Sequence, residues 1–286
     1  MVRPLRRTYH QATLRIRGRQ FDWGARTYIM AIINTTPDSF RGDGVGSDVD
    51  AAVALAKRFE SEGADIIDIG GESSRPGATP LGAAEELERV IPSLEAVREA
   101  TRLPISIDTM HAVVAKAALA AGADMVNDIW GLRSDANMAK AAFEASAPLV
   151  AMHNQRGRDS HDVIGDIRKG FHETLRLAAG ARIPRDFIIL DPGFGFGWAA
   201  PQNFEMLRRL RELWEFELPL LVGTSRKSSI GTLLDLPVDE RLEGTAATVA
   251  LAIAGGADIV RVHDVREMRR VARISDAVVR ANWAPA

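Results

Sequence analysis

Eight short apolar runs, each of which stops on a polar or charged residue, restrict the fold of this chain more than any other feature. Stretches with helical periodicity lie between most of them, so strands and helices alternate. Such alternation is typical of a parallel sheet, in which a helix returns the chain to the start of the next strand. The runs cover residues 28–34, 66–72, 105–108, 125–128, 148–153, 187–191, 219–225 and 259–263.

Eight strand–helix units predict an α/β fold of the TIM type, a closed (β/α)8 barrel. A doubly wound open sheet is the structural alternative, because alternation alone does not say whether a sheet closes. In a closed parallel barrel all strands end at one face, and the chemistry of such barrels takes place there. Helices are predicted over residues 48–61, 83–100, 112–121, 136–145, 162–179, 203–214, 241–254 and 265–280.

The segment before the first run predicts a small β-hairpin. Residues 12–18 alternate apolar and polar side chains and turn at Gly18 into residues 20–23. Such a hairpin could plug one end of the barrel, and residues 1–10 are expected to form a loosely attached arm. We therefore divide the chain into an arm with hairpin, residues 1–27, and a barrel, residues 28–286.

Composition limits the partners of the chain. It has 286 residues, a formal net charge of −2 and no cysteine. Nucleic acids and membrane surfaces attract concentrated basic charge, so a small-molecule substrate fits better. Without cysteine there is no disulfide or thiolate metal site, and no apolar run approaches the roughly 18 residues of a membrane span. We expect no signal peptide and a cytoplasmic location.

Carboxylate or amide side chains lie at or next to the ends of the third, fourth and sixth runs, at Asp108, Asn127 and Asp191. Taken singly, each fits a structural hydrogen bond, but three that converge at one barrel mouth suit a heterocycle with a row of N–H donors. Lys227 and Ser228 follow the seventh run, where barrels commonly bind anions. An ordinary helix N-terminus is the alternative for this pair.

Two glycine-bearing loops follow the first two runs. Asn34 opens the first loop, and its neutral oxygen could complete the shell of Mg²⁺, which keeps several waters and relies on substrate phosphates. Ser74 and Arg75 in the second loop could clamp a phosphate oxygen through charge-assisted hydrogen bonds. Each loop also fits an ordinary surface turn.

Arg261 and His263 alternate on the eighth run, so their side chains point the same way. An arginine beside a histidine at a strand end suits a diphosphate leaving group. The alternative is a structural ion pair, for example with Asp258 or Asp264. His153, at the end of the fifth run, fits a buried core residue as well as a catalytic one.

Taken together, these segments resemble the dihydropteroate synthases of the pterin-binding TIM-barrel group. The resemblance extends from residue 29 to about residue 280. The matching segments are 33–40, 65–77, 105–109, 127–128, 152–153, 190–197, 225–228 and 261–265, and they occur in the order of that family.

The resemblance implies that 6-hydroxymethyl-7,8-dihydropterin diphosphate condenses with 4-aminobenzoate to give 7,8-dihydropteroate and diphosphate, in a cytoplasmic homodimer. It implies catalytic roles for Asp108, Lys227, Arg75, Arg261 and His263. Its pterin-binding residues would be Asp108, Asn127, Met152, Asp191, Phe196, Gly223 and Lys227. The diphosphate would contact Asn34, Ser74, Arg75, Arg261 and His263, with Mg²⁺ at Asn34. Phe40, Pro76, Lys227 and Ser228 would frame the 4-aminobenzoate.

Two other functions remain open at this point. One is a methyltetrahydrofolate methyltransferase that acts on a corrinoid protein and needs no diphosphate clamp, and the other is a catalytically weak pterin-binding paralogue. The chain also departs from the family pattern at Ser229, where phenylalanine is frequent, at Trp198, where lysine is frequent, and in a longer first loop around Asp43. We hypothesise that Ser229 and this loop alter the affinity for sulfonamides.

Overall fold

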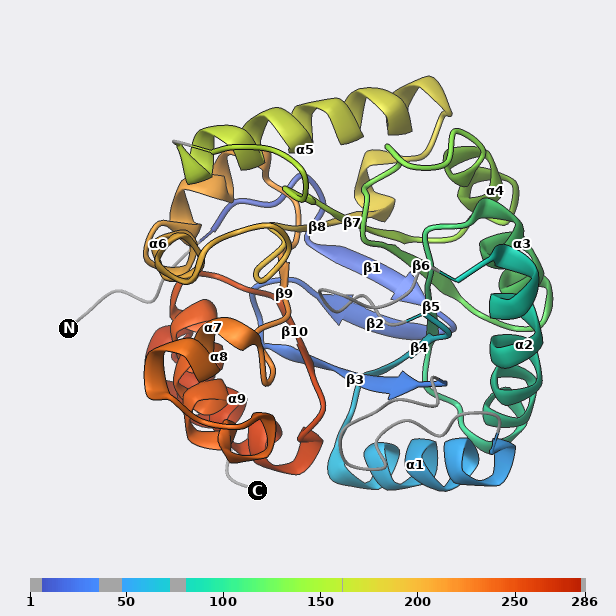
Figure 1. Ribbon diagram of the computed structural model, residues 1–286, viewed down its shortest axis with the longest axis horizontal. Coiled ribbons are helices and arrows are strands. Elements are labelled where there is room, and N and C mark those ends of the chain that lie inside the picture. Colours follow the sequence, from blue (N-terminus) through green and yellow to red (C-terminus); the bar gives the residue numbers. More distant parts are fainter. Residues whose placement is uncertain (1–6, 36–47, 73–80, 161, 284–286) are drawn as a thin grey trace.

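A computed structural model describes residues 7–35, 48–72, 81–160 and 162–283. Eight parallel strands follow one another in the order β8-β7-β6-β5-β4-β3-β10-β9 (Figure 1). A bridge between Leu190 and Leu220 joins the two ends of this order, so the sheet is a nearly closed barrel. The predicted (β/α)8 barrel is confirmed, and the open doubly wound sheet is excluded. The strands are β3 (Tyr28–Asn34), β4 (Ile66–Gly70), β5 (Ile105–Asp108), β6 (Met125–Asp128), β7 (Leu149–Met152), β8 (Ile188–Asp191), β9 (Leu221–Val222) and β10 (Ile259–Val262).

Helices cover the outside of the barrel at close to the predicted positions. They are α1 (Val49–Glu62), α2 (Ala83–Ala100), α3 (Ala112–Ala120), α4 (Met138–Glu144), α5 (Val163–Gly180), α6 (Ala200–Arg208), α7 (Ser228–Leu234), α8 (Leu242–Ala254) and α9 (Val265–Val279). Short 3₁₀ turns cover Arg185–Phe187, Leu210–Phe216 and Val238–Glu240. No helix among the described residues is both long and apolar enough to cross a membrane.

Two helix predictions were wrong in detail. The predicted helix over residues 203–214 instead begins at Ala200, where Gln202 Oε1 accepts a hydrogen bond from the N–H of Ala199 at 2.9 Å, and it gives way to a 3₁₀ turn after Arg208. Helix α7 was not among the predicted helices, since its serines, threonine and Gly231 are weak helix formers, but its start agrees with the alternative of a helix N-terminus at Lys227 and Ser228. Its burial against the barrel, rather than its intrinsic propensity, stabilises it.

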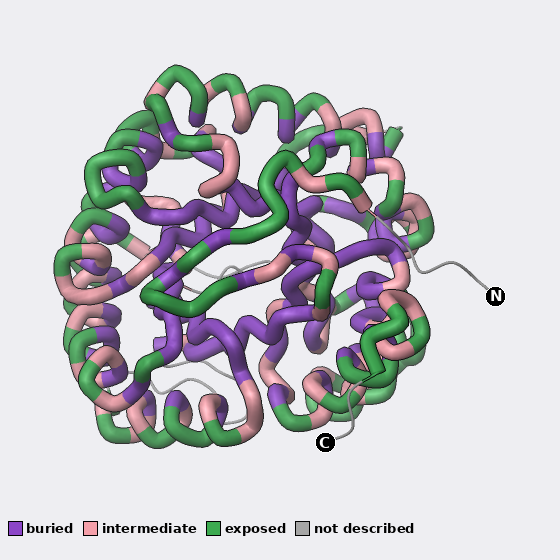
Figure 2. Tube along the Cα trace, turned by 180° about the vertical axis from the view of Figure 1, so that it is seen from behind, coloured by how far each residue is buried: buried purple, intermediate pink, exposed green. Residues whose placement is uncertain are grey.

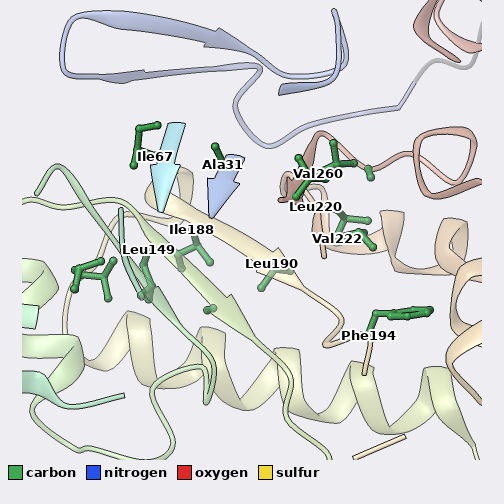
Figure 3. Packing of buried hydrophobic residues seen from close by; sticks show 14 of the residues in the cluster. Ala31, Ile67, Leu149, Ile188, Leu190, Phe194, Leu220, Val222 and Val260 are labelled. Atoms are coloured by element: carbon green, nitrogen blue, oxygen red, sulfur yellow. The ribbon is translucent and has the colours of Figure 1, made fainter. Parts of the chain in front are cut away.

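The strands carry two cores, one on each face. Along β3, Ile29, Ala31 and Ile33 face the helices, whereas Tyr28 and Met30 belong to the core inside the barrel. Figure 3 shows the outer core, in which Ile67, Leu149 and Val260 gather with other strand residues. In Figure 2 the buried strands lie inside a ring of helices whose outward turns are exposed. Burial on both faces explains why the runs are continuously apolar instead of alternating.

The predicted N-terminal hairpin is confirmed and closes one end of the barrel. Strands β1 (Thr13–Ile16) and β2 (Arg19–Asp22) pair antiparallel. Phe21 and Trp23 join the inner core, and the ring of Phe21 lies 4.7 Å from that of Tyr28. The opposite end, where the strands finish, is left for polar side chains.

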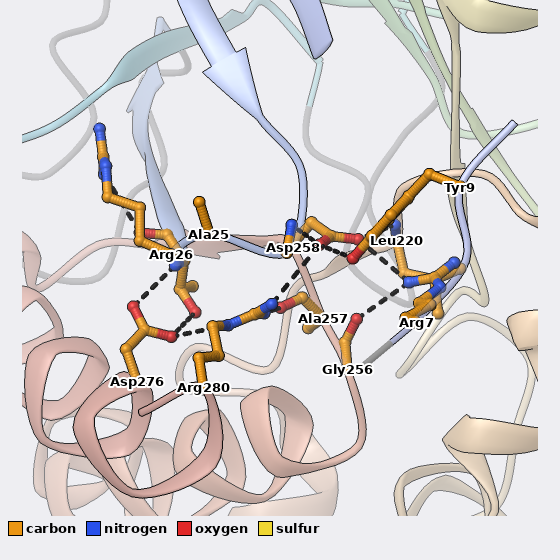
Figure 4. Close-up of polar contacts among 12 residues, drawn as sticks. Arg7, Tyr9, Ala25, Arg26, Leu220, Gly256, Ala257, Asp258, Asp276 and Arg280 are labelled. Carbon is orange, nitrogen blue, oxygen red and sulfur yellow. Dashed lines mark hydrogen bonds and ion pairs between the residues drawn. The ribbon is translucent and has the colours of Figure 1, made fainter. Parts of the chain in front are cut away.

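The arm before the hairpin is not loose over the residues described. The guanidinium of Arg7 donates to the carbonyls of Gly256 and Leu218 and to Asp258, and the hydroxyl of Tyr9 donates to Asp258 at 2.6 Å (Figure 4). The expectation of a loosely attached arm is therefore wrong for residues 7–10. Residues 1–6 lie outside the described part of the chain.

Candidate active site

Parallel register brings the predicted polar residues to one rim of the barrel. The paired positions are Asn34 with Gly70, Gly70 with Asp108, Asp108 with Asn127, and Met152 with Asp191. Each of these residues ends its strand or stands next to its end. The strand termini thus form a continuous arc at the face opposite the hairpin, as a parallel barrel requires.

Arg261 connects three strands across this rim. Its Nε donates to Asp68 Oδ2 and its Nη2 to Asp108 Oδ2, each at 2.6 Å. Asn127 Nδ2 donates to the same Asp68 oxygen at 3.1 Å. Arg261 therefore forms ion pairs, as the structural alternative expected, but its partners are Asp68 and Asp108 and not the suggested Asp258 or Asp264.

Asp68 lies at the centre of this ion-pair network, and the sequence assigned it no role. It is fully buried, and its Oδ1 has no hydrogen-bond partner among the described residues. The sequence feature that could have indicated a role for Asp68 is its position in the middle of an apolar run, because a buried carboxylate without a partner is costly. Asp68 positions the guanidinium of Arg261 and leaves one acceptor unused.

Burial shifts the charges at the rim toward neutrality. It raises the pKa of Asp191 to about 6, against the opposing effects of the Gly193 N–H and of Lys227. It also raises the pKa of Asp108, a shift that the Arg261 guanidinium opposes. Conversely, burial and the nearby Arg261 lower the pKa of Lys227 to about 8. The rim therefore holds poorly solvated charges that a ligand with complementary polar groups would stabilise.

The loop after β8 provides an aromatic wall. Lys227 Nζ lies 4.1 Å from the centre of the Phe196 ring, and the guanidinium carbon of Arg156 lies 4.7 Å from the same centre. Gly195 has φ +86°, and a Cβ there would come within 2.9 Å of Lys227 Cδ. Glycine is therefore required for Lys227 to reach its position.

Ser229 is connected to this loop by hydrogen bonds through Asn203. It is buried, and its Oγ accepts a hydrogen bond from Asn203 Nδ2 at 2.9 Å. Asn203 Oδ1 in turn accepts from the N–H of Gly195 at 2.6 Å. Ser229 thus contacts the mouth through Asn203, whereas Ser228 is exposed in the first turn of α7.

The end of β10 meets the segment after β9. His263 Nδ1 lies 2.9 Å from the hydroxyl of Ser225, and a Cβ on Gly223 would lie 3.6 Å from that of Arg261. Gly223, Arg261 and His263 thus lie in one part of the rim. Asp264 pairs with Arg226.

Sequence and structure comparisons identify the family. Residues 30–263 match the model of a family described as pterin binding enzymes. A protein of Clostridium beijerinckii named dihydropteroate synthase is 46% identical to the chain, over 93% of this chain and 100% of that protein. The chain belongs to the dihydropteroate synthase family.

Solved structures of dihydropteroate synthases share the fold. The crystal structure of the Clostridium difficile enzyme in the presence of pteroic acid is 48% identical, with a TM-score of 0.87, and the match covers 91% of this chain and 99% of that chain. The Xanthomonas albilineans enzyme with 4-aminobenzoic acid is 40% identical, with a TM-score of 0.87, and the match covers 93% of this chain and 98% of that chain. The likeness extends over nearly the whole chain.

Within the dihydropteroate synthase fold of this chain, His153 is a core residue. It is buried, its Nε2 lies 2.9 Å from Gln155 Oε1, and its ring lies 5.7 Å from that of Trp198. Burial lowers its pKa to about 4, so the imidazole is neutral at pH 7. Its backbone N–H donates to the carbonyl of Asp191 at 2.8 Å, which fixes the β8 end. The structural alternative for His153 is favoured over the catalytic one.

Four predicted site residues of this dihydropteroate synthase family member lie outside the described residues: Phe40, Ser74, Arg75 and Pro76, as does Asp43 of the first loop. The described part of the proposed diphosphate clamp therefore consists of Asn34, Arg261 and His263. Met152 is buried beside Asp191 in the register of β7 and β8.

Proposed function

We propose that this protein is a dihydropteroate synthase, a transferase of folate biosynthesis. It condenses 6-hydroxymethyl-7,8-dihydropterin diphosphate with 4-aminobenzoate to give 7,8-dihydropteroate and diphosphate. The observation that carries the proposal is the arc of Asp108, Asn127, Asp191 and Lys227 at one rim of a barrel from this family.

The pterin ring would bind along this arc. Its edge presents N–H donors, and ionised Asp191 is an acceptor. Gly193 engages only Oδ1 of Asp191 within the described part of the chain, which leaves Oδ2 for the ring. Lys227 would donate to a ring oxygen or nitrogen, while Met152 and Phe196 pack beside the ring and Gly223 gives it room.

The reaction requires stabilisation of the cation that forms when diphosphate leaves, and it does not require a strong general base. Loss of diphosphate leaves positive charge on the pterin methylene carbon, and a fixed carboxylate nearby stabilises that charge as it develops. One pair of unit charges 4 Å apart gives about 4 kcal/mol at an effective dielectric of 20, a ceiling of roughly three decades in rate. Asp108 fills this role. The arylamine nitrogen is uncharged at neutral pH, so it attacks without prior deprotonation.

The diphosphate would lie over the β3, β4 and β10 ends. Arg261 uses Nε and Nη2 for Asp68 and Asp108, so Nη1 is the nitrogen that would reach the diphosphate, together with His263. Ser74 and Arg75 would complete the clamp, and Phe40, Pro76, Lys227 and Ser228 would frame the 4-aminobenzoate.

Mg²⁺ is the proposed cofactor at Asn34. This residue ends β3 at the rim, is partly buried and offers a neutral oxygen, a donor type that suits Mg²⁺. When bound beside substrate phosphates, Mg²⁺ would offset the negative charge of the leaving group.

We also propose a cytoplasmic homodimer. Helices α8 and α9 pack against each other, and each exposes large apolar side chains, at Leu251, Ile274 and Val278. Exposed apolar surface on adjacent helices is typical of an interface. Light scattering should give twice the chain mass at micromolar concentration, and a monomer would contradict the proposal.

One assay tests the function. Purified protein with the pterin diphosphate, 4-aminobenzoate and Mg²⁺ should form dihydropteroate and diphosphate in equal amounts, and Asp108→Asn should form at least about 100-fold less. Pterin binding without product would select the catalytically weak paralogue. Methyl transfer from methyltetrahydrofolate to a corrinoid protein would select the methyltransferase, for which no observation in this chain argues.

A further inference from the structure

We propose that Glu72, Glu86 and His111 form a binding site for one divalent transition-metal ion, separate from the pterin site. Glu72 follows β4, Glu86 lies in the first turn of α2, and His111 precedes α3. One ligand atom from each residue lies within 4.8 Å of the other two. Three segments distant in sequence thus bring two carboxylates and an imidazole to one point.

A buried oxygen without a partner is the second observation. Glu86 is fully buried, and its Oε2 lies 2.8 Å from His111 Nδ1. Thr109 also faces this carboxylate, yet Oε1 has no hydrogen-bond partner among the described residues. Oε1 shares a carbon with Oε2, so it lies at the same cluster. An ordinary Glu86–His111 ion pair accounts for one oxygen of Glu86 and leaves the other orphaned.

Charge around the cluster also favours a cation. Glu72 lies close enough to Glu86 to act on it electrostatically, and Asp135 acts in the same way on His111. The described cation that acts on Glu72 is Arg156. Asp108 also acts on Glu86 electrostatically. Among the described residues, carboxylates thus outnumber the cationic groups around the cluster, and a divalent ion would offset the excess negative charge.

The ligand types select the kind of metal. Imidazole nitrogen with two carboxylate oxygens suits Zn²⁺ and similar ions, whereas Mg²⁺ prefers an all-oxygen shell. The side chain of His111 is 26% exposed, which gives the ion a path from solvent. The N–H of His111 donates to the hydroxyl of Thr109, which follows Asp108 at the end of β5. Since Glu72 follows β4, the bound ion would link the ends of β4 and β5.

Calorimetric titration of the untagged full chain with Zn²⁺ tests the proposal. The titration is done in excess Mg²⁺, which saturates sites made only of oxygen ligands. Wild type should bind one Zn²⁺ per chain. His111→Phe and Glu72→Gln should each weaken binding by at least about 100-fold, since loss of outer-shell partners alone weakens metal affinity 10–100-fold. Co²⁺ should give a visible d–d spectrum that His111→Phe abolishes.

Two controls make the result specific. His172→Phe changes an exposed histidine on α5, and Asn34→Ala removes the proposed Mg²⁺ ligand, so both should leave Zn²⁺ binding unchanged. Circular dichroism of each variant shows that it is folded. Absence of stoichiometric Zn²⁺ binding by wild type, or equal affinity in folded His111→Phe, would overturn the proposal.

Discussion

Asp258 at the base of the barrel and Asp191 at its mouth are both buried carboxylates at the end of a strand, but their surroundings differ. Asp258 accepts hydrogen bonds from Arg7 at 3.0 Å, from the Tyr9 hydroxyl at 2.6 Å and from two backbone N–H groups. Among the described residues, the Asp191 carboxylate accepts one hydrogen bond, from the N–H of Gly193 at 2.8 Å. At the base, the buried carboxylate hydrogen-bonds to distant segments of the chain. At the mouth, the buried carboxylate keeps acceptor capacity for a ligand.

Other buried charged groups show the same difference between the base and the mouth of the barrel. At the base, Asp276 accepts from the N–H and hydroxyl of Thr27 at 2.7 and 2.8 Å and from Arg280 at 2.9 Å (Figure 4). At the mouth, one Asp68 oxygen has no hydrogen-bond partner in the described part of the chain, and burial lowers the pKa of Lys227. A buried charge with all its partners costs the fold little, whereas a buried charge that lacks a partner reduces stability and can be satisfied by a ligand.

We expect the largest loss of stability and activity from substitution of Arg261, which forms ion pairs with Asp68 and Asp108 at the mouth. Arg261→Met leaves Asp68 and Asp108 without their guanidinium, and removal of one partner of a buried pair costs about 3–5 kcal/mol. It also removes a proposed diphosphate ligand, so kcat/KM should fall at least about 1,000-fold. Denaturant unfolding and steady-state kinetics measure the two losses. Activity within tenfold of wild type would contradict the assignment of Arg261.

At the base, Asp258→Ala should destabilise the protein without changing the chemistry. It leaves the buried Arg7 guanidinium without its carboxylate and the Tyr9 hydroxyl without its acceptor, for a loss of about 3–5 kcal/mol in the free energy of unfolding. The folded variant should keep its kcat and its KM for both substrates, measured at a temperature below its unfolding transition. A tenfold loss of kcat in folded Asp258→Ala would show that the base and the mouth are coupled.

The pH dependence of pterin affinity should have two limbs. Below about pH 6, Asp191 takes up a proton and loses its acceptor, and above about pH 8, Lys227 loses its charge. Affinity should fall by up to about tenfold per pH unit on either side. Calorimetry from pH 5 to pH 9 measures both limbs. Asp191→Asn should weaken the acid limb and leave the alkaline limb unchanged, because Asp108, whose pKa burial also raises, still takes up a proton on the acid side. A flat profile for wild type would show that neither group contacts the pterin.

The sequence predicted the barrel and the rim because both depend on local patterns. Period, run length and the polar residue at each run end place Asp108, Asn127 and Asp191 together without any knowledge of packing. The pairing of Arg261 with Asp68 was missed because it joins residues 193 positions apart across the barrel. The docking of Arg7, the short helix α7 and the burial of His153 likewise depend on contacts between distant segments.

The most direct test of the division between base and mouth is Asp191→Asn, with stability and pterin affinity measured on the same protein at pH 8. The folded pKa of Asp191 is raised, so its contribution to stability is complete below about pH 4 and is lost as the pH rises through about 6. Asparagine keeps the acceptor for Gly193 and carries no charge. At pH 8 the variant should therefore be more stable than wild type, by at most about 3 kcal/mol, with no gain at pH 4, and its pterin affinity should fall at least about tenfold. A variant that is less stable at pH 8, or that binds pterin as wild type does, would contradict the account.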